Sequence, residues 1–227
     1  MTRASDTARL LGAGGTFGGN IVLPNAGNIG SASDTDAIAI SSGGVVTFTQ
    51  NTVGAGGMDL LLDTTSTSSG GNIDISSTYI NSTYDDYFLL FNLDPDTDDK
   101  NLAMQVFVGG TAQTGNIYGS ETKFIGSSNS QNNTNAGGEF IFNQVGIGSD
   151  DGRGISGQLL LQNVNDTNHS FCYSGFMNLF STAGNTTGNI VAGSLIAANK
   201  ASVVNGLRFF MSQGQCVGDF KLYGLRT

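Results

Sequence analysis

Charged side chains are scarce in this sequence: they make up only 12% of the 227 residues, against about 25% in ordinary soluble domains. In place of lysine and glutamate, the composition is rich in serine, threonine, asparagine and glycine, with 34 glycines in all. There are only two prolines. Lysine, glutamate and arginine are the residues that usually cover helix surfaces. Their scarcity favours short strands joined by turns that are rich in glycine, asparagine, serine and aspartate. We therefore predict an all-β protein.

Basic residues are the rarer of the two charged classes. Nine lysines and arginines face 18 aspartates and glutamates, which gives a formal net charge of −9. Nucleic-acid binding needs basic side chains to neutralise phosphates, and an anionic membrane surface attracts the same residues. No apolar run approaches the ~20 residues of a membrane span, and the N-terminal residues lack the apolar core of a signal peptide. We expect neither nucleic acid nor membrane as a partner.

Residues that carry catalysis are also few. His169 is the only histidine; Ser170 follows it directly and so points to the opposite face of a strand, and no GxSxG motif is present. Glu121 and Glu139 are the only glutamates, which weakens a glycosidase interpretation. The glycine-rich runs lack the Lys-Ser/Thr of a phosphate-binding loop. We predict no catalytic residues, no cofactor and a protein that is not an enzyme.

The two cysteines, Cys172 and Cys216, are too few for a disulfide framework, and no CxxC spacing occurs. We expect two buried thiols that pack as small apolar side chains, with a single bridge between them as the alternative.

A cluster of aspartates is the one pattern typical of a metal site. Asp94, Asp96 and Asp98 alternate along the chain, and carboxylates are the ligands that Ca²⁺ prefers. The EF-hand pattern is not met, because Asp99 stands where glycine is required and Gln105 where glutamate is required. The segment joins two expected strands, where aspartate and proline are ordinary turn residues. We expect a solvated turn, and a metal site formed by these aspartates is the alternative.

The chain divides into three zones. Within residues 1–19, a turn of helix that starts at Ser5 would be far too short to be stable alone. We expect an attachment arm that orders against a partner through Arg3, Asp6, Arg9, Leu10 and Leu11. Residues 20–57 contain three short apolar runs, at 21–23, 37–40 and 45–48. They predict a small β connector that is interwoven between chains of an oligomer. An ordinary pair of strands packed on the main domain is the alternative.

Residues 58–227 carry the main domain. Alternating apolar and polar residues predict strands at regular spacing, at 58–62, 73–80, 86–93, 101–109, 117–124, 138–147, 155–163, 168–180, 188–198, 203–211 and 217–225. This number of strands fits an antiparallel β-sandwich of the jelly-roll type. The nearly continuous apolar run 88–93 predicts a strand that is covered on both faces.

One segment of the main domain has no periodicity. Residues 125–137 are rich in asparagine, serine and glutamine, and we expect a long exposed loop there. Amide side chains offer hydrogen-bond donors and acceptors together. The candidate receptor contacts are therefore Asn129, Gln131, Asn132, Asn133 and Asn135. Exposed tyrosines would have to serve as stacking platforms for sugars, because the chain has no tryptophan.

The last two runs, 203–211 and 217–225, are joined by the polar residues 212–215. Alternation on both sides of a four-residue loop with a glycine predicts a β-hairpin. Two segments of this region resemble the end of a β-sandwich domain of bacteriophage virion appendage proteins, that is, tail fibres and head fibres of marine-type phages. The segments are Asn205-Gly206-Leu207-Arg208-Phe209 and Gly218-Asp219-Phe220-Lys221-Leu222-Tyr223-Gly224-Leu225. Residues 71–79 and 84–91 resemble the opening hairpin of that family, and 154–163 its central strand.

The resemblance implies a structural protein of the virion, assembled in the cytoplasm of a bacterial host. Members of this family are commonly homotrimers, so the resemblance implies two further copies of the chain as partners. It also implies a tail adaptor, nozzle or major capsid protein that holds the arm. A short tail fibre or head fibre whose C-terminal knob contacts the host surface is the expected setting. A capsid decoration (cement) protein at the symmetry axes, or a receptor module that binds a host surface glycan, are the alternatives.

Overall fold

The computed structural model describes residues 26–31, 34–48, 57–67, 71–125, 131–150, 152–196 and 202–225. The expected attachment arm, with Arg3, Asp6, Arg9, Leu10 and Leu11, and the expected strand at 21–23 lie outside these residues. The chain forms two units, Met1–Ala55 and Gly56–Thr227. We describe each of them by itself.

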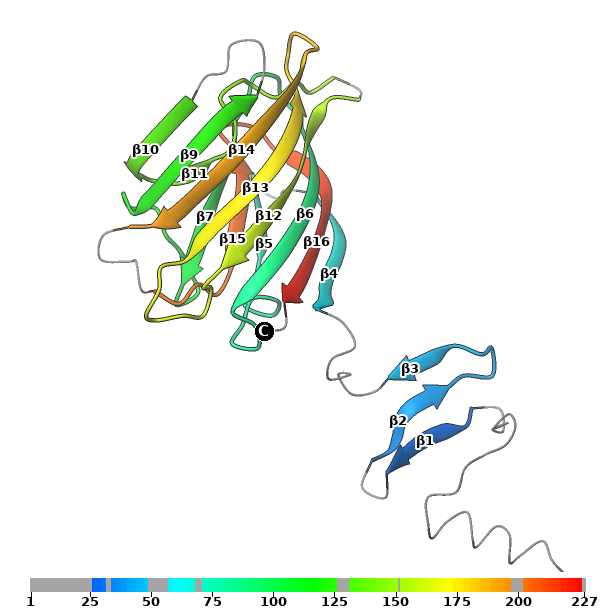
Figure 1. Ribbon diagram of the computed structural model, residues 1–227. Coiled ribbons are helices and arrows are strands. Elements are labelled where there is room, and N and C mark those ends of the chain that lie inside the picture. Colours follow the sequence, from blue (N-terminus) through cyan, green and yellow to red (C-terminus); the bar gives the residue numbers. More distant parts are fainter. Residues whose placement is uncertain are drawn as a thin grey trace, which may run out of the picture. The chain divides into compact units, whose positions relative to one another are not determined.

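The N-terminal unit contains a three-stranded antiparallel sheet in the order β1 (Asn28–Ser31), β2 (Asp34–Ile40) and β3 (Val46–Phe48) (Figure 1). Ile38 of β2 pairs with Ile29 of β1 and with Phe48 of β3. The apolar runs expected at 37–40 and 45–48 are therefore confirmed as strands.

The second unit is a sandwich of two antiparallel sheets (Figure 1). The large sheet has eight strands in the order β10 (Gln131–Gly137), β9 (Tyr118–Ile125), β14 (Thr186–Leu195), β13 (Cys172–Phe180), β12 (Gly154–Gln162), β6 (Asp86–Pro95), β16 (Cys216–Leu225) and β4 (Met58–Thr67). The small sheet has the order β11 (Phe140–Ile141), β7 (Leu102–Val108), β15 (Leu207–Met211) and β5 (Asn72–Ile75), and β8 (Thr111–Ala112) pairs with β7.

The chain passes repeatedly from one sheet to the other. It changes layer at each step from β4 to β5, from β5 to β6 and from β6 to β7. Consecutive strands pair with each other only at β7–β8, at β9–β10 and in the meander β12–β13–β14 of the described part of this unit. Such alternation between layers is typical of jelly-roll-like sandwiches. The expected all-β antiparallel sandwich is confirmed. The described residues contain no helix, and accordingly none that could cross a membrane.

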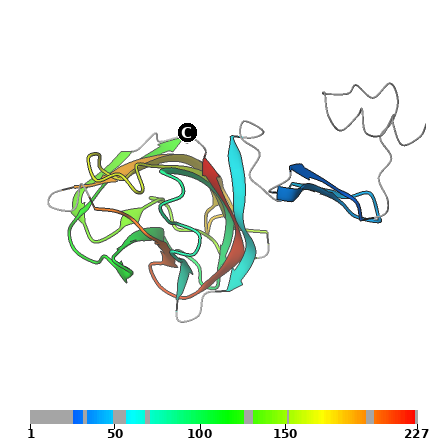
Figure 2. The same cartoon turned by 90° about the horizontal axis from the view of Figure 1, so that it is seen from below.

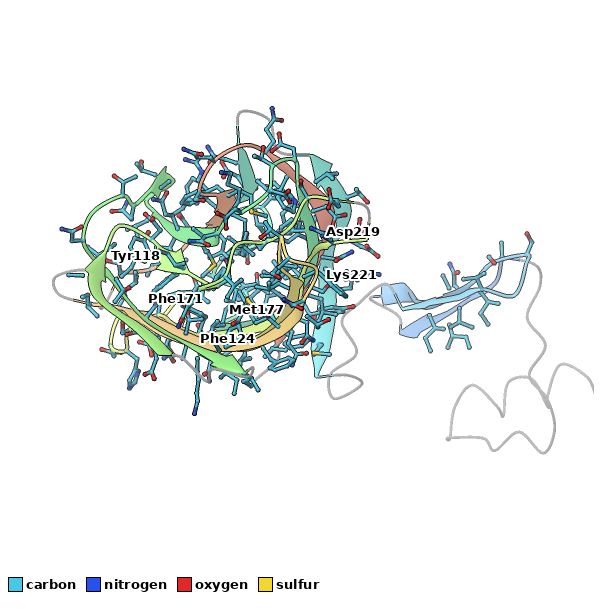
Figure 3. The ribbon with its side chains drawn as sticks, turned by 90° about the horizontal axis from the view of Figure 1, so that it is seen from above. Tyr118, Phe124, Phe171, Met177, Asp219 and Lys221 are labelled. Atoms are coloured by element: carbon cyan, nitrogen blue, oxygen red, sulfur yellow. The ribbon has the colours of Figure 1, made fainter. Side chains whose placement is uncertain are left out.

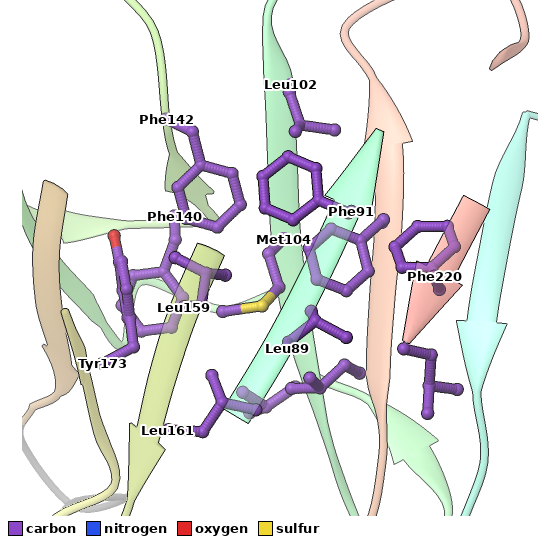
Figure 4. Packing of buried hydrophobic residues seen from close by; sticks show 14 of the residues in the cluster. Leu89, Phe91, Leu102, Met104, Phe140, Phe142, Leu159, Leu161, Tyr173 and Phe220 are labelled. Atoms are coloured by element: carbon purple, nitrogen blue, oxygen red, sulfur yellow. The ribbon is translucent and has the colours of Figure 1, made fainter. Parts of the chain in front are cut away.

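The core lies between the two sheets, which curve around it (Figure 2). Along β6 the buried residues alternate, with Tyr87, Leu89 and Leu93 fully buried. Figure 4 shows side chains of both layers meeting in the core, such as Leu89 and Phe91 of the large sheet and Met104 of the small one. Figure 3 shows Tyr118, Phe171 and Met177 between the layers and Asp219 and Lys221 on the outside.

The two predicted hairpins are wrong. β15 belongs to the small sheet and β16 to the large one, so residues 212–215 cross between layers and do not join paired strands. The same holds at the start of the sandwich, where β5 pairs with β15 while β6 pairs with β16 and β12. A hairpin and a crossing between layers share the same alternation and the same turn residues. The crossing at 212–215 is fixed by Asp96, which exchanges two hydrogen bonds with the Gln215 backbone.

The prediction of one long loop at 125–137 is also wrong, because Gln131–Gly137 form strand β10 on β9. An edge strand needs only backbone pairing on one side, so a polar sequence can form it. The strand expected at 138–147 is reduced to Phe140–Ile141 and an isolated bridge at Ile147. The strand expected at 73–80 ends at Ile75. In the run 88–93 only one face is fully buried, and Phe88 and Leu90 on the other face are half-buried.

Candidate functional site

The outward face of the large sheet carries a group of apolar side chains, which we call the apolar face. Its members come from six strands: Leu60, Phe88, Leu90, Leu160, Phe176, Ile190 and Tyr223. The strand register forms two groups: Phe88 lies opposite both Leu160 and Tyr223, and Phe176 lies opposite Ile190. The exposed Gln158 lies between Leu90 and Phe176. Leu60, Ile190 and Phe176 are 54%, 48% and 40% exposed. Exposed apolar side chains gathered on one face of a sheet are typical of a contact with another molecule.

Charges of both signs border the apolar face. On one side Lys221 of β16 lies 3.1 Å from Asp63 of β4. On the other side, β9 carries Glu121 and Lys123, which are both exposed. Each border carries both a basic and an acidic side chain. A second copy of the chain that packs on the apolar face can therefore place opposite charges against each border.

A polar cleft lies on the same outward side, where β6 ends, β12 begins and β13 ends. It is lined by Asn92, Asp94, Arg153, Ser156, Asn178 and Phe180, together with Gly152 and Gly154, and has a volume of about 270 Å³. Antiparallel pairing brings these residues together, because β6 and β13 run in one direction on either side of β12. We call this feature the polar cleft.

Glycine and a network of hydrogen bonds shape the polar cleft. Gly154 has a φ of +134°, and a side chain there would place its Cβ 2.2 Å from an oxygen of Asp94. Arg153 is anchored by Nη1, which donates to the Thr182 carbonyl at 2.6 Å and lies 3.0 Å from Asp150. The Ser156 hydroxyl donates to the Asn92 side-chain oxygen at 2.7 Å.

Two side chains of the polar cleft keep their hydrogen-bonding capacity. Within the described residues, neither Asp94 nor Asn178 makes a side-chain hydrogen bond, and both are exposed. Partial burial and, after it, the negative charge of Asp219 raise the pKa of Asp94 above its ordinary value. Its carboxylate therefore gains from any ligand that donates hydrogen bonds to it.

The three aspartates expected to be a possible metal site do not converge. Asp94 lines the polar cleft, whereas Asp96 accepts from the Gln215 N–H at 2.8 Å and Asp98 from the Ser149 N–H at 2.7 Å. These backbone hydrogen bonds lower the pKa of Asp96 and of Asp98. Among the described residues, no three histidine, cysteine or carboxylate side chains gather as metal ligands.

The single histidine takes part in a surface turn. His169 has a side chain that is 72% exposed, and its Nδ1 contacts Asp166. The hydrogen bond from the Asn168 N–H is the main cause that lowers the pKa of Asp166, and the hydrogen bond with the His169 side chain is the second. The neighbouring Ser170 hydroxyl donates to the Leu195 carbonyl at 2.6 Å. His169 and Ser170 thus serve separate local contacts.

The two cysteines are not bridged. Cys172 is half-buried on the outward side of β13, and Cys216 is buried at the start of β16. Burial, together with the charge of Asp86, raises the pKa of the Cys172 thiol. Cys172 also lines a second, more open hollow of about 400 Å³ beside Gly119, Glu121 and Ser194. Small residues form most of this hollow, so it offers few side-chain partners to a ligand.

The candidate receptor contacts are spread along one sheet edge. Gln131, Asn132, Asn133 and Asn135 lie on β10, and Asn129 falls outside the described residues.

Comparison of the chain with protein-family models, with curated proteins and with solved structures returned no match.

Proposed function

We propose that this chain is a structural protein of a bacteriophage virion, a short trimeric tail fibre or head fibre. The N-terminal arm anchors it to the particle, and the β-sandwich unit forms a knob. The resemblance of the closing and opening segments supports the virion setting, and the two-unit organisation agrees with an anchor followed by a knob. The observation that carries the proposal is the apolar face.

The occupant of the apolar face is a second copy of this chain. Its apolar centre is bordered by Lys221 and Asp63 on one side and by Lys123 and Glu121 on the other. In a ring of copies around a rotation axis, the Lys221–Asp63 border of one copy meets the Lys123–Glu121 border of the next. Unlike charges can then face each other across each contact. Three copies close the ring in the proposed trimer.

We expect the full chain to have a mass of about 70 kDa in solution, three times the 23.4 kDa of one chain. The double variant Phe176→Ser, Ile190→Ser should weaken this association at least tenfold, because each truncation removes about 1–2 kcal/mol of apolar burial from an interface. Light scattering after gel filtration over a range of concentrations measures the effect.

Val203→Ser is the matched control, because Val203 is 37% exposed and lies outside the apolar face. It should leave the mass unchanged. A wild-type chain that stays monomeric at high micromolar concentration, or a double variant that associates like the wild type, would contradict the assignment of this surface.

The second test concerns the anchor. Deleting residues 1–19 should leave the sandwich unit folded and abolish incorporation into phage particles, because the arm makes the attachment. Quantitative mass spectrometry of purified particles measures the copy number of the wild-type and shortened chains. Incorporation of the shortened chain at normal copy number would show that the arm is not the anchor.

A density map of intact particles in which this chain carries a label shows its location on the particle. That location distinguishes a tail fibre, a head fibre and a decoration protein at the symmetry axes.

A further inference from the structure

We propose that the polar cleft binds a single neutral sugar ring. This site goes beyond the proposed role in the virion and does not depend on it, since it lies within the sandwich unit of one chain. The cleft volume of about 270 Å³ is close to the lower limit of about 300 Å³ for pockets that hold drug-sized ligands. It therefore suits one sugar ring better than a longer chain buried along its whole length.

The polar groups of the cleft match the hydroxyl groups of a sugar. A hydroxyl donates one hydrogen bond and accepts others. Asp94 supplies a carboxylate that only accepts, and the Arg153 guanidinium supplies N–H groups that only donate. Asn178 supplies both kinds at the same rim. One hydroxyl of a sugar ring can therefore donate to Asp94 while the adjacent hydroxyl accepts from Arg153.

An aromatic wall completes the site. Phe180 lines the cleft and remains 41% exposed, although a phenylalanine gains free energy when it is covered. The C–H face of a sugar ring is apolar and flat enough to cover it. A pocket with an aromatic wall and a few convergent polar groups is the usual form of a small-molecule site.

The charges of the cleft favour a neutral ligand. Arg153 is already paired with Asp150, and Asp94 is close enough to Asp219 to feel its charge. The whole chain carries a net charge of −9. An acidic sugar or a phosphate would meet this negative field, whereas a neutral hexose would not.

The site is also arranged before a ligand arrives. Gly154 leaves room for the Asp94 carboxylate, and the Thr182 carbonyl holds Arg153 in place. Asn92 is fixed by the hydroxyl of Ser156. Such fixed partners lower the entropy that is lost on binding.

Saturation-transfer NMR on the full chain tests the proposal. The probes are D-glucose, D-galactose, D-mannose and N-acetylneuraminate, each at millimolar concentration. At least one neutral hexose should receive saturation at its ring C–H protons. Phe180→Ala and Asp94→Asn should each weaken its binding about tenfold, because the first removes the apolar wall and the second a charged acceptor.

The controls are Ile125→Ala, an exposed apolar residue of β9, and Asp85→Asn, an exposed carboxyl before β6; neither lines the cleft. Both should bind like the wild type. Asp94→Asn keeps the shape of its side chain, so it remains informative if Phe180→Ala does not fold. The proposal is overturned if no neutral hexose binds, if binding survives both cleft substitutions, or if N-acetylneuraminate binds more tightly. A chain that forms trimers without binding sugar would overturn this inference alone.

Discussion

Replacing Phe209 by alanine should lower the free energy of unfolding of the sandwich unit by about 3–5 kcal/mol. Phe209 lies on β15 of the small sheet and is fully buried. Its ring centre is 6.2 Å from that of Phe91 and 5.3 Å from that of Phe220, both on the large sheet. The substitution removes an aromatic ring that joins the two layers and leaves a cavity between them.

Thermal and urea unfolding of the purified chain, followed by near-ultraviolet circular dichroism, measure this loss. A domain of this size loses about 2–4 °C of Tm per kcal/mol, so the midpoint should fall by about 10 °C. Phe210→Ala is the matched control, because Phe210 is the next residue on β15 but points outward and is half-buried. Equal losses in the two variants would mean that the layers are not joined at Phe209.

The strands of this protein could be predicted from the sequence because alternation of apolar and polar residues is a local property. Alternation over residues 217–225, for example, predicts a strand, and β16 is Cys216–Leu225. The layer to which a strand belongs is not a local property. In β15 and β16 the alternation is the same whether the strands pair with each other or face each other across the core, and here they face each other.

The polar cleft shows the same limit at the level of the site. In the sequence Asp94 belongs to an aspartate cluster, but its neighbours in the cleft include Arg153 and Asn178, which lie far along the chain. No linear motif connects the three residues. They meet only because β12 pairs with β6 on one side and with β13 on the other. β6 and β12 are not consecutive strands, and such a pairing cannot be deduced from one sequence.

Turns account for only part of the high glycine content. Gly44, Gly110 and Gly214 occur in turns with positive φ. Gly175 and Gly218 instead lie inside strands. A side chain at Gly175 would place its Cβ 2.2 Å from the Gln158 carbonyl oxygen. Glycine within a strand indicates a close approach of two backbones.

Replacing Gly218 by alanine should therefore lower the free energy of unfolding by about 3 kcal/mol, at the upper end of the range for overpacking. The added Cβ would lie 2.1 Å from the Asn92 carbonyl oxygen and 2.8 Å from the Leu93 Cα. Both atoms belong to the backbone of β6, so no side-chain rotation can relieve the overlap. β16 and β6 would have to separate, and these two paired strands join edge strand β4 to the rest of the large sheet.

Gly188→Ala is the control that separates this effect from a general intolerance of glycine substitution. Its Cβ would meet the Phe176 ring at 3.5 Å and the Asn178 amide oxygen at 3.6 Å, which are ordinary contacts. Alanine also restricts the unfolded chain, so this variant should unfold within about 0.5 kcal/mol of the wild type or be slightly more stable. The same unfolding measurements compare the two variants. If Gly218→Ala were as stable as Gly188→Ala, the backbones of β6 and β16 could not approach as closely as the structure shows.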